Sequence, residues 1–293
     1  MSVTRMRLRK IFQFLTDNRD WNQHFQDYEY RRRLAYCAAE PNPRQARLQE
    51  LLRGTAATQS MPSMRLLSPF WQCLNEFEAK GINSMEAFTE HLAITKSQPE
   101  VLVEATRPLE RLYMELKKRE GWGGKTAALF VKNVIRIHQG PVKFHFWKDA
   151  SKLCRGSLND DCVYLPVDRV IEEIFRALGM KRPTFKKINE LLHTHYDSDE
   201  MIVWDDLWFW GFFTQVVVKP KNPKNSDGKE TPSKRLMKWN EEKFWCQITT
   251  QKPHKQTQEE IASEFIHLLD LKRNSATKSK QLIDDKKGRG RIV

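Results

Sequence analysis

The chain has 293 residues, enough for one large helical domain or two smaller ones that share a core. Its 50 Lys and Arg outnumber its 37 Asp and Glu, so the formal net charge is +13. Such a chain attracts polyanions, although charge alone names no partner. No run approaches the ~20 apolar residues of a membrane span, and Met1–Lys10 is not followed by the apolar stretch of a secretory signal. We therefore expect a monomer of the cytoplasm, nucleoid or nucleus that is not secreted and has no membrane partner.

The cysteines give no sign of a disulfide framework or a metal site. They are odd in number and scattered, and no two of them are separated by two residues, the spacing typical of metal-binding pairs. We expect no metal and no other cofactor. The five residues are Cys37, Cys73, Cys154, Cys162 and Cys246.

Apolar residues at helical spacing recur along the first half of the chain. Prolines, glycines and small polar residues predict loops at 41–43 and 54–63. A proline at position 108 is expected to break the last helical pattern of this half. The predicted helices are Leu8–Leu15, Asp27–Ala39, Leu66–Phe77, Phe88–Ile94 and Val101–Leu116.

The second half also reads as mainly helical, with one irregular segment. Residues 140–165 are rich in aromatics and lysines without a clear period and are interpreted as an insertion. Residues 220–234 are expected to form a polar loop, and 272–293 a basic disordered tail. Thr257-Gln-Glu-Glu260 is a capping box that predicts another helix start. The further predicted helices run from the turn at Gly121 to about Ile137, and over Asp168–Leu178, Phe185–His193 and Trp204–Phe213; the strand signal is weak, so the fold class is mainly α.

A glycine-rich turn precedes the most clearly two-faced of these helices. The segment reads Gly121-Trp-Gly-Gly-Lys-Thr-Ala127. Glycines let backbone N–H groups approach a phosphate closely, and a helix N-terminus adds positive partial charge. A Walker A phosphate loop is excluded because Arg119 stands where that motif needs its first glycine, and no strand pattern precedes the turn. The predicted contacts to a DNA backbone are Gly121, Gly123, Gly124, Thr126 and Lys132.

Charged residues on the far face of this helix have a simpler interpretation. Lys132 and Arg136 follow Lys125 by seven and eleven residues, on the face opposite the apolar stripe. A solvated surface is the ordinary meaning of such a pattern. Lys125 differs because it directly follows the glycines.

A second short segment, Pro166-Val167-Asp168, opens the next helical pattern. Aspartate is a favoured helix N-cap, and capping is the simplest role for Asp168 considered alone. A carboxylate at this position is also able to stabilise a developing positive charge. The residues themselves leave both roles open.

Together the two segments resemble the helix-hairpin-helix DNA glycosylases, and among their branches the 8-oxoguanine glycosylase/lyases most closely. The resemblance covers about Leu116–Gly179, and Leu178-Gly179 follows the aspartate at the family's spacing of eleven residues. Two features depart from the family pattern. Arg169-Val170 replaces the usual Thr-His pair, and 43 residues separate Lys125 from Asp168, more than in most members.

This resemblance implies both a fold and catalytic roles. It implies two helical subdomains with a helix-hairpin-helix motif and a cleft between them: 1–70 with 180–271, and 71–179 with the insertion at 140–165. Lys125 would be the nucleophile, and Asp168 would stabilise the sugar cation and position or deprotonate the amine. Some members carry a four-cysteine iron–sulfur cluster near the C-terminus. With Cys246 alone in that region, we expect no iron–sulfur cluster here.

Aromatic residues are the candidates for a pocket that receives a flipped base. Core packing is the simpler interpretation for most of them, and a structural role the simpler one for His145. The candidates are Phe144, His145, Trp147, Trp204 and Trp208.

The resulting functional hypothesis is a DNA base-excision glycosylase with AP lyase activity that acts by base flipping and Schiff-base chemistry. The alternative is a non-enzymatic helix-hairpin-helix protein that binds nucleic acid. A nuclease is disfavoured because carboxylates do not cluster at metal-ligand spacing. The pattern leaves open which base is removed, whether the lyase step occurs, and whether the DNA is the host's own or modified foreign DNA.

Overall fold

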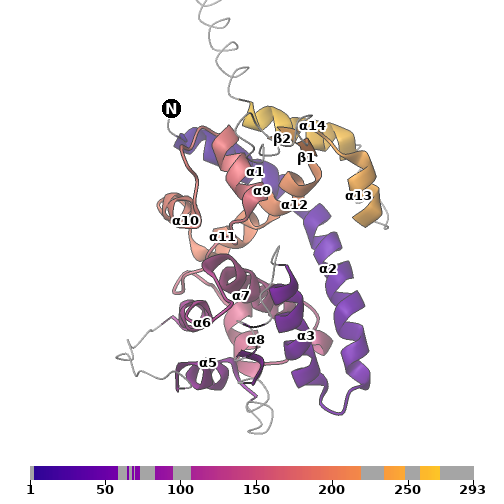
Figure 1. The fold of residues 1–293 in the computed structure, drawn as a ribbon, viewed down its shortest axis with the longest axis vertical. Helices are drawn as coiled ribbons and strands as arrows, with labels where there is room; N and C mark the ends of the chain where they lie inside the picture. The colour runs from indigo at the N-terminus through magenta and orange to yellow at the C-terminus, as the bar shows by residue number, and fades with distance from the viewer. Residues whose placement is uncertain are drawn as a thin grey trace, which may run out of the picture. The chain divides into compact units, whose positions relative to one another are not determined.

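The computed structural model describes residues 3–58, 65, 68, 70–72, 83–94, 107–218, 234–247 and 258–270. These residues form a mainly α structure with one short hairpin, so the predicted fold class is confirmed at that level (Figure 1). The predicted tail at 272–293 and nearly all of the predicted loop at 220–234 lie outside the described residues. Most of the predicted helix Leu66–Phe77 does so too.

The chain packs as two compact units. Unit 1 contains 1–21, 169–184 and 206–293, and unit 2 contains 22–168 and 185–205. The predicted subdomains, 1–70 with 180–271 and 71–179, divide the chain at other places. Asp168 is therefore the last residue of its segment in unit 2, and the helix after it belongs to unit 1.

Unit 1 is built from helices and a two-stranded antiparallel hairpin, β1 (Gln215–Val218) and β2 (Lys234–Met237). The sequence showed little strand signal, yet the β-branched run in β1 suits an extended backbone. Phe14 packs against Trp210 and Phe265, with ring centroids 5.4 and 5.3 Å apart. The helices are α1 (Arg5–Asp17), α9 (Arg169–Ala177), α12 (Asp206–Phe213), α13 (Glu241–Gln247) and α14 (Gln258–Leu269).

A glycine lets two helices of unit 1 approach closely. A Cβ atom on Gly211 of α12 would lie 2.6 Å from Ile174 Cδ1 and 2.7 Å from Val170 Cγ1, both on α9. Atoms cannot approach so closely without moving the core, so this contact requires glycine. Gln215 extends the same contact, since its Nε2 donates to Val170 O at 2.8 Å.

Unit 2 is organised around α7 (Gly124–Gln139), which packs against α3, α6 and α8. Its apolar stripe is buried as predicted, because the residues recur at helical spacing. The stripe consists of Ala127, Phe130, Val131, Val134 and Ile135. The surrounding elements are most of α2 (Arg19–Ala35), η1 (Tyr36–Ala39), α3 (Pro43–Ala57), α5 (Met85–Ile94), α6 (Pro108–Lys117), η2 (Val142–Phe144), α8 (Lys148–Arg155), α10 (Phe185–His193) and α11 (Ser198–Trp204).

The segment interpreted as an insertion, 140–165, is an integral part of this unit. It forms η2, α8 and an extended stretch, and its side chains fill the core. Trp147 is 2% exposed, with its ring 5.2 Å from that of Phe88 and 6.5 Å from that of Phe130. The aromatic residues of the segment therefore owe their presence largely to packing.

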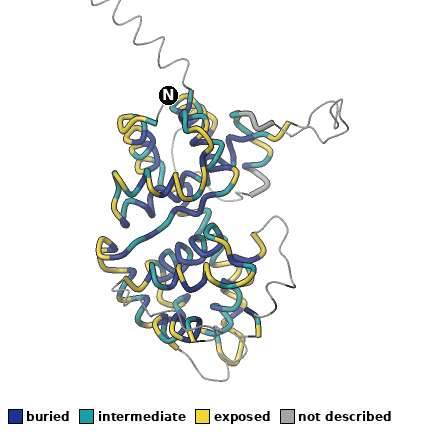
Figure 2. Tube along the Cα trace, turned by 60° about the vertical axis from the view of Figure 1, so that its left-hand side comes forward, coloured by how far each residue is buried: buried dark blue, intermediate teal, exposed yellow. Residues whose placement is uncertain are grey.

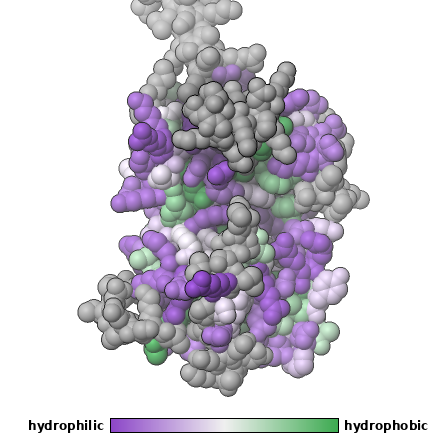
Figure 3. All heavy atoms as spheres, in the orientation of Figure 1, coloured by the Kyte–Doolittle hydropathy of each residue, from purple (hydrophilic) through white to green (hydrophobic). Residues whose placement is uncertain are grey.

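Burial follows the helical pattern throughout the described residues. Buried and exposed residues alternate along the helices in Figure 2, and hydrophilic side chains cover much of the described surface seen in Figure 3. No helix in the described part of the chain combines the length and the apolar character needed to cross a membrane.

Two histidines in unit 2 share one serine hydroxyl. Ser151 Oγ lies 2.8 Å from His138 Nδ1 and 2.9 Å from His145 Nδ1. His145 Nε2 must donate to Gly140 O, 3.0 Å away, because a carbonyl only accepts. His138 is fully buried, and its Nε2 has no hydrogen-bond partner. Burial, with the nearby positive charges of His145 and Arg155 adding to it, lowers the pKa of His138 to about 3.

This neutral histidine makes stability depend on pH. Its folded-state pKa of about 3 lies below the ~6.5 of an unfolded chain, so the unfolded state binds the proton better as the pH falls. The free energy of unfolding should therefore drop by about 2 kcal/mol from this residue between pH 7 and pH 5. Urea titrations at both pH values should show a smaller drop in His138→Asn than in His195→Asn. Equal drops in the two variants would contradict this account of His138.

Candidate nucleic-acid interface

The glycine-rich turn joins two helices that pack against each other, α6 and α7. Gly121 has φ of 79°, a left-handed conformation that favours glycine. Trp122 anchors the turn, since its side chain is 4% exposed and its ring lies 6.0 Å from that of Phe130. Gly123 is exposed directly before α7, and a Cβ atom there would find nothing within 4 Å. The turn thus presents bare backbone beside the start of a helix.

Gly124 lies against aromatic side chains on the inner side of the turn. A Cβ atom there would be 3.2 Å from Tyr113 Oη and 3.4 Å from Phe185 Cε1. Tyr113 also stacks on Tyr164 at 4.4 Å between ring centroids, and Phe185 lies 6.2 Å from each tyrosine ring. We call Tyr113, Tyr164 and Phe185 the aromatic cluster. It brings α6, α10 and the extended segment before Asp168 together behind the turn.

Lys125 occupies the first turn of α7 and is half-buried. Its Nζ donates to Thr58 O, 3.3 Å away, and forms no ion pair with Asp168. The first turn of α7 carries no acidic residue that would neutralise the amine. The amine is therefore exposed to solvent and hydrogen-bonded to a backbone carbonyl.

Asp168 ends an extended segment in which buried and partly exposed residues alternate from Asp161 to Leu165 and Pro166 and Val167 are both buried. Val163, Leu165 and Val167 are buried, while Tyr164 and Asp168 are half-buried. Alternation with a period of two puts Tyr164 and Asp168 on the same side of an extended chain. Asp168 directly precedes α9, the position of a helix N-cap.

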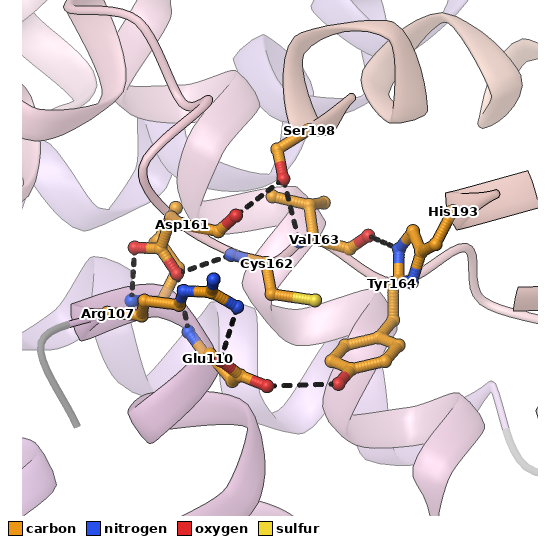
Figure 4. Close-up of polar contacts among 9 residues, drawn as sticks. Arg107, Glu110, Asp161, Cys162, Val163, Tyr164, His193 and Ser198 are labelled. Carbon is orange, nitrogen blue, oxygen red and sulfur yellow. Dashed lines mark hydrogen bonds and ion pairs between the residues drawn. The ribbon is translucent and has the colours of Figure 1, made fainter. Parts of the chain in front are cut away.

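Side chains fix this segment by satisfying its backbone groups. Asn189 Oδ1 accepts from Leu165 N at 2.7 Å, and its Nδ2 donates to Leu165 O at 3.1 Å. Ser198 and His193 bind the backbone around Val163 (Figure 4). The buried Asp161 carboxylate accepts from Leu109 N and Glu110 N at the start of α6. Buried backbone groups need such partners, so the segment has a defined path.

A polar chain runs from α6 to Tyr164 (Figure 4). Arg107 lies 3.5 Å from the Glu110 carboxylate, and Tyr164 Oη donates to Glu110 Oε1 at 3.2 Å. Burial, together with the neighbouring Cys162 and Glu110, raises the pKa of Tyr164 well above its usual value. The sequence patterns did not predict a role for Tyr164, Asn189 or the rest of this polar chain. The alternation Val163-Tyr164-Leu165 was the one sequence signal that pointed to it.

Two of the predicted DNA contacts have buried side chains. Thr126 and Lys132 are each 4% exposed. Lys132 Nζ lies 3.1 Å from Asp205 Oδ2, and Arg136 Nη2 lies 3.2 Å from the same oxygen. The expected solvated face of α7 is therefore wrong at these positions, because it faces the end of α11 rather than water. Neither Thr126 nor Lys132 therefore has a side chain exposed to bind a phosphate.

The candidates for a base pocket are mostly core residues. Trp147 and Trp204 are 2% and 0% exposed. Phe144 lines a hollow of about 10 Å³, far below the ~300 Å³ typical of ligand sites. His145 is held by the Ser151 and Gly140 contacts described above. Trp208, in unit 1, is partly exposed and stacks on Phe212 at 4.8 Å.

Metal ligands do not gather in the described residues. Within this part of the chain, no three His, Cys, Asp or Glu side chains lie in positions to hold an ion. Cys37 and Cys154 are free and buried, and Cys162 is free and half-buried. The expectation that the protein needs no cofactor remains a prediction.

Because Gly124 lies against Tyr113, substitutions at these two positions should have non-additive effects on the free energy of unfolding. Gly124→Ala should destabilise the protein by about 1–2 kcal/mol, because the buried Tyr113 ring has little room to yield. Tyr113→Phe removes the hydroxyl from this contact, so the double variant should recover at least ~0.5 kcal/mol relative to the sum of the single changes. Denaturant unfolding of the four proteins measures the coupling. Additive effects would show that the hydroxyl does not restrict position 124.

Comparison with known proteins adds no family assignment. No protein-family model, no curated protein and no solved structure matches the chain. The geometry of the turn, of Lys125 and of the Asp168 segment therefore carries the functional argument.

Proposed function

We propose that this protein is a DNA base-excision glycosylase with AP lyase activity. The observation that carries the proposal is the accessible Lys125 amine, in the first turn of α7 behind an exposed glycine turn. In this proposal α6, the turn and α7 form a helix-hairpin-helix motif. The packing of α6 against α7 and the left-handed Gly121 are consistent with such a hairpin.

The turn would hold the DNA backbone through its main chain. Gly123 is exposed with open space around it, so a phosphate is able to approach the N–H groups at the start of α7. These groups have no partner within the helix because they belong to its first turn. The net charge of +13 favours such a polyanion.

Lys125 would supply the covalent chemistry. Its neutral amine attacks C1′ of the sugar, the C1′–N bond to the base breaks, and the base leaves with the bonding electrons and takes up a proton. The amine gives one proton to the Asp168 carboxylate and a second to O4′ as the C1′–O4′ bond breaks, so the opened sugar is left as a Schiff base. Beta-elimination then removes a proton from C2′, forms a C2′=C3′ double bond and breaks the C3′–O bond, so the 3′ phosphate leaves and the strand is nicked. The base must leave the helical stack before this sequence begins.

Asp168 would act through its negative charge. The sugar becomes positively charged as the base leaves, and a nearby carboxylate stabilises that charge. The same carboxylate is suited to accept a proton from the attacking amine. Its half-buried position at the end of a firmly held segment fits this role, since a fixed charge needs little rearrangement during the reaction.

The alternative is a helix-hairpin-helix protein that binds nucleic acid without catalysis. The hydrogen bond from Lys125 to Thr58 O favours it, because it leaves Lys125 without an ion pair to Asp168. A catalytic pair would need to approach within hydrogen-bond reach, directly or through one water, when DNA is bound. Both functions share the DNA-binding turn and differ in the covalent step.

Replacement of the amine separates the two functions. Lys125→Ala should abolish the complex that borohydride traps with lesion-containing duplexes, and DNA binding should remain largely intact. The matched control is Lys148→Ala, which removes an exposed amine on α8, outside the proposed interface; it should still be trapped. Trapping by Lys125→Ala would identify another amine as the nucleophile, and a wild type that releases no base from any tested lesion would favour the binding protein.

Replacement of the carboxylate tests its charge. Asp168→Asn keeps the shape and most of the capping ability of the side chain but removes the negative charge. Base release under single-turnover conditions should slow by about 100-fold or more, while the melting temperature changes little. A rate close to that of the wild type would remove Asp168 from the catalytic account.

A further inference from the structure

We propose that α10 forms a second contact surface for duplex DNA, beside the glycine turn. The surface, called here the basic face, consists of Lys117, Lys118, Arg119, Lys125, Lys186 and Lys187. This inference rests on the proposed function, because it assigns a further part of the DNA interface. It concerns unit 2 alone.

The aromatic cluster places these cations near one another. Phe185, the first residue of α10, contacts the position of a Gly124 Cβ at 3.4 Å, so the starts of α10 and α7 are adjacent. Lys186 and Lys187 follow Phe185 in the first turn of α10, and both are exposed. Lys117, at the end of α6, lies over the Tyr113 ring with Nζ 5.8 Å from its centroid. The aromatic cluster thus lies where the end of α6 meets the starts of α7 and α10, the segments that carry these residues.

Positive charge prevails on this face. Glu115 and Glu190 lie beside these lysines, Glu120 follows Arg119 in the chain, and Glu110 binds Tyr164 of the aromatic cluster, so four acidic residues accompany six basic ones. Glu115 binds Lys118 at 2.8 Å, whereas Glu190 lies 3.7 Å from Lys186, with both side chains mostly exposed. An exposed pair of this kind is weak and screened by salt, so it yields readily to a phosphate.

Lysines in the first turn of a helix reduce the stability of that helix, and α7 and α10 both carry them there. The first turns of α7 and α10 contain no acidic residue and carry lysines instead. Helices are stabilised by acidic residues at this end and disfavour positive charge there. Two adjacent helix starts of this composition attract negative charge, and the phosphates of a duplex supply it along a continuous surface.

The test compares two double variants in binding to an undamaged duplex over a range of salt concentrations. Lys186→Gln with Lys187→Gln should weaken binding by roughly 10- to 60-fold at about 0.1 M salt. The slope of log affinity against log salt concentration should also become shallower by about 2, since each phosphate contact contributes ~0.9 to that slope. Lys186→Arg with Lys187→Arg should retain binding. The matched control, Lys148→Gln with Lys152→Gln, removes two exposed charges from α8.

The two control lysines, Lys148 and Lys152, lie on α8, which contacts the end of α7 far from the glycine turn. Ser151 of α8 contacts His138, fourteen residues after Gly124, which is roughly 21 Å along the helix. If the α10 variant binds as the control does, or if both lose affinity equally, the inference is overturned. Borohydride trapping by the wild type reports on the proposed function separately. A wild type that binds duplex but is not trapped would refute the enzyme and leave the basic face intact.

Discussion

The extended segment before Asp168 depends on one amide side chain. This segment pairs with no strand in the described residues, so its buried backbone groups need other partners. Asn189 meets this need at Leu165 with a donor and an acceptor on one side chain, at 2.7 and 3.1 Å. An amide is the side chain suited to this task, because it carries both kinds of atom on one planar group. The position of Leu165, three residues before Asp168, follows from it.

The helix that carries Asn189 also supports the glycine turn. Phe185, at the start of α10, lies against Gly124, and Asn189 follows one turn later. Its amide also donates to Phe185 O at 3.0 Å. One short helix therefore links the start of α7 to the segment that leads to Asp168. In the proposed enzyme this linkage would hold the backbones of Lys125 and Asp168 in place, although 43 residues separate them in the sequence.

Helical periodicity predicted much of the fold. The pattern at Phe185–His193 matches α10 at both ends, and the helix expected after the glycine turn ends at about Ile137, two residues before α7 does. The break expected near Pro108 became the start of α6, where proline is favoured. The pattern at Trp204–Phe213 predicts one helix, whereas the chain ends α11 at Trp204 and begins α12 at Asp206. Local patterns locate helices well because packing selects their apolar faces.

Long-range partners limited the prediction of the site. A lysine on the polar face of a helix ordinarily faces water, but Lys132 and Arg136 meet Asp205, which lies about seventy residues further along the chain. Periodicity cannot reveal such a pair, because it depends on how α11 returns to α7. The aromatic residues of 140–165 were likewise ambiguous, since core packing and base recognition select the same residue types.

The central claim is that the Lys125 amine forms the covalent bond to DNA. The most direct measurement is peptide mapping by mass spectrometry of the borohydride-reduced protein–DNA complex after nuclease digestion. The account predicts a sugar remnant on the peptide that contains Lys125, at that residue. A remnant on any other lysine, such as Lys117 or Lys186 of the basic face, would contradict the account.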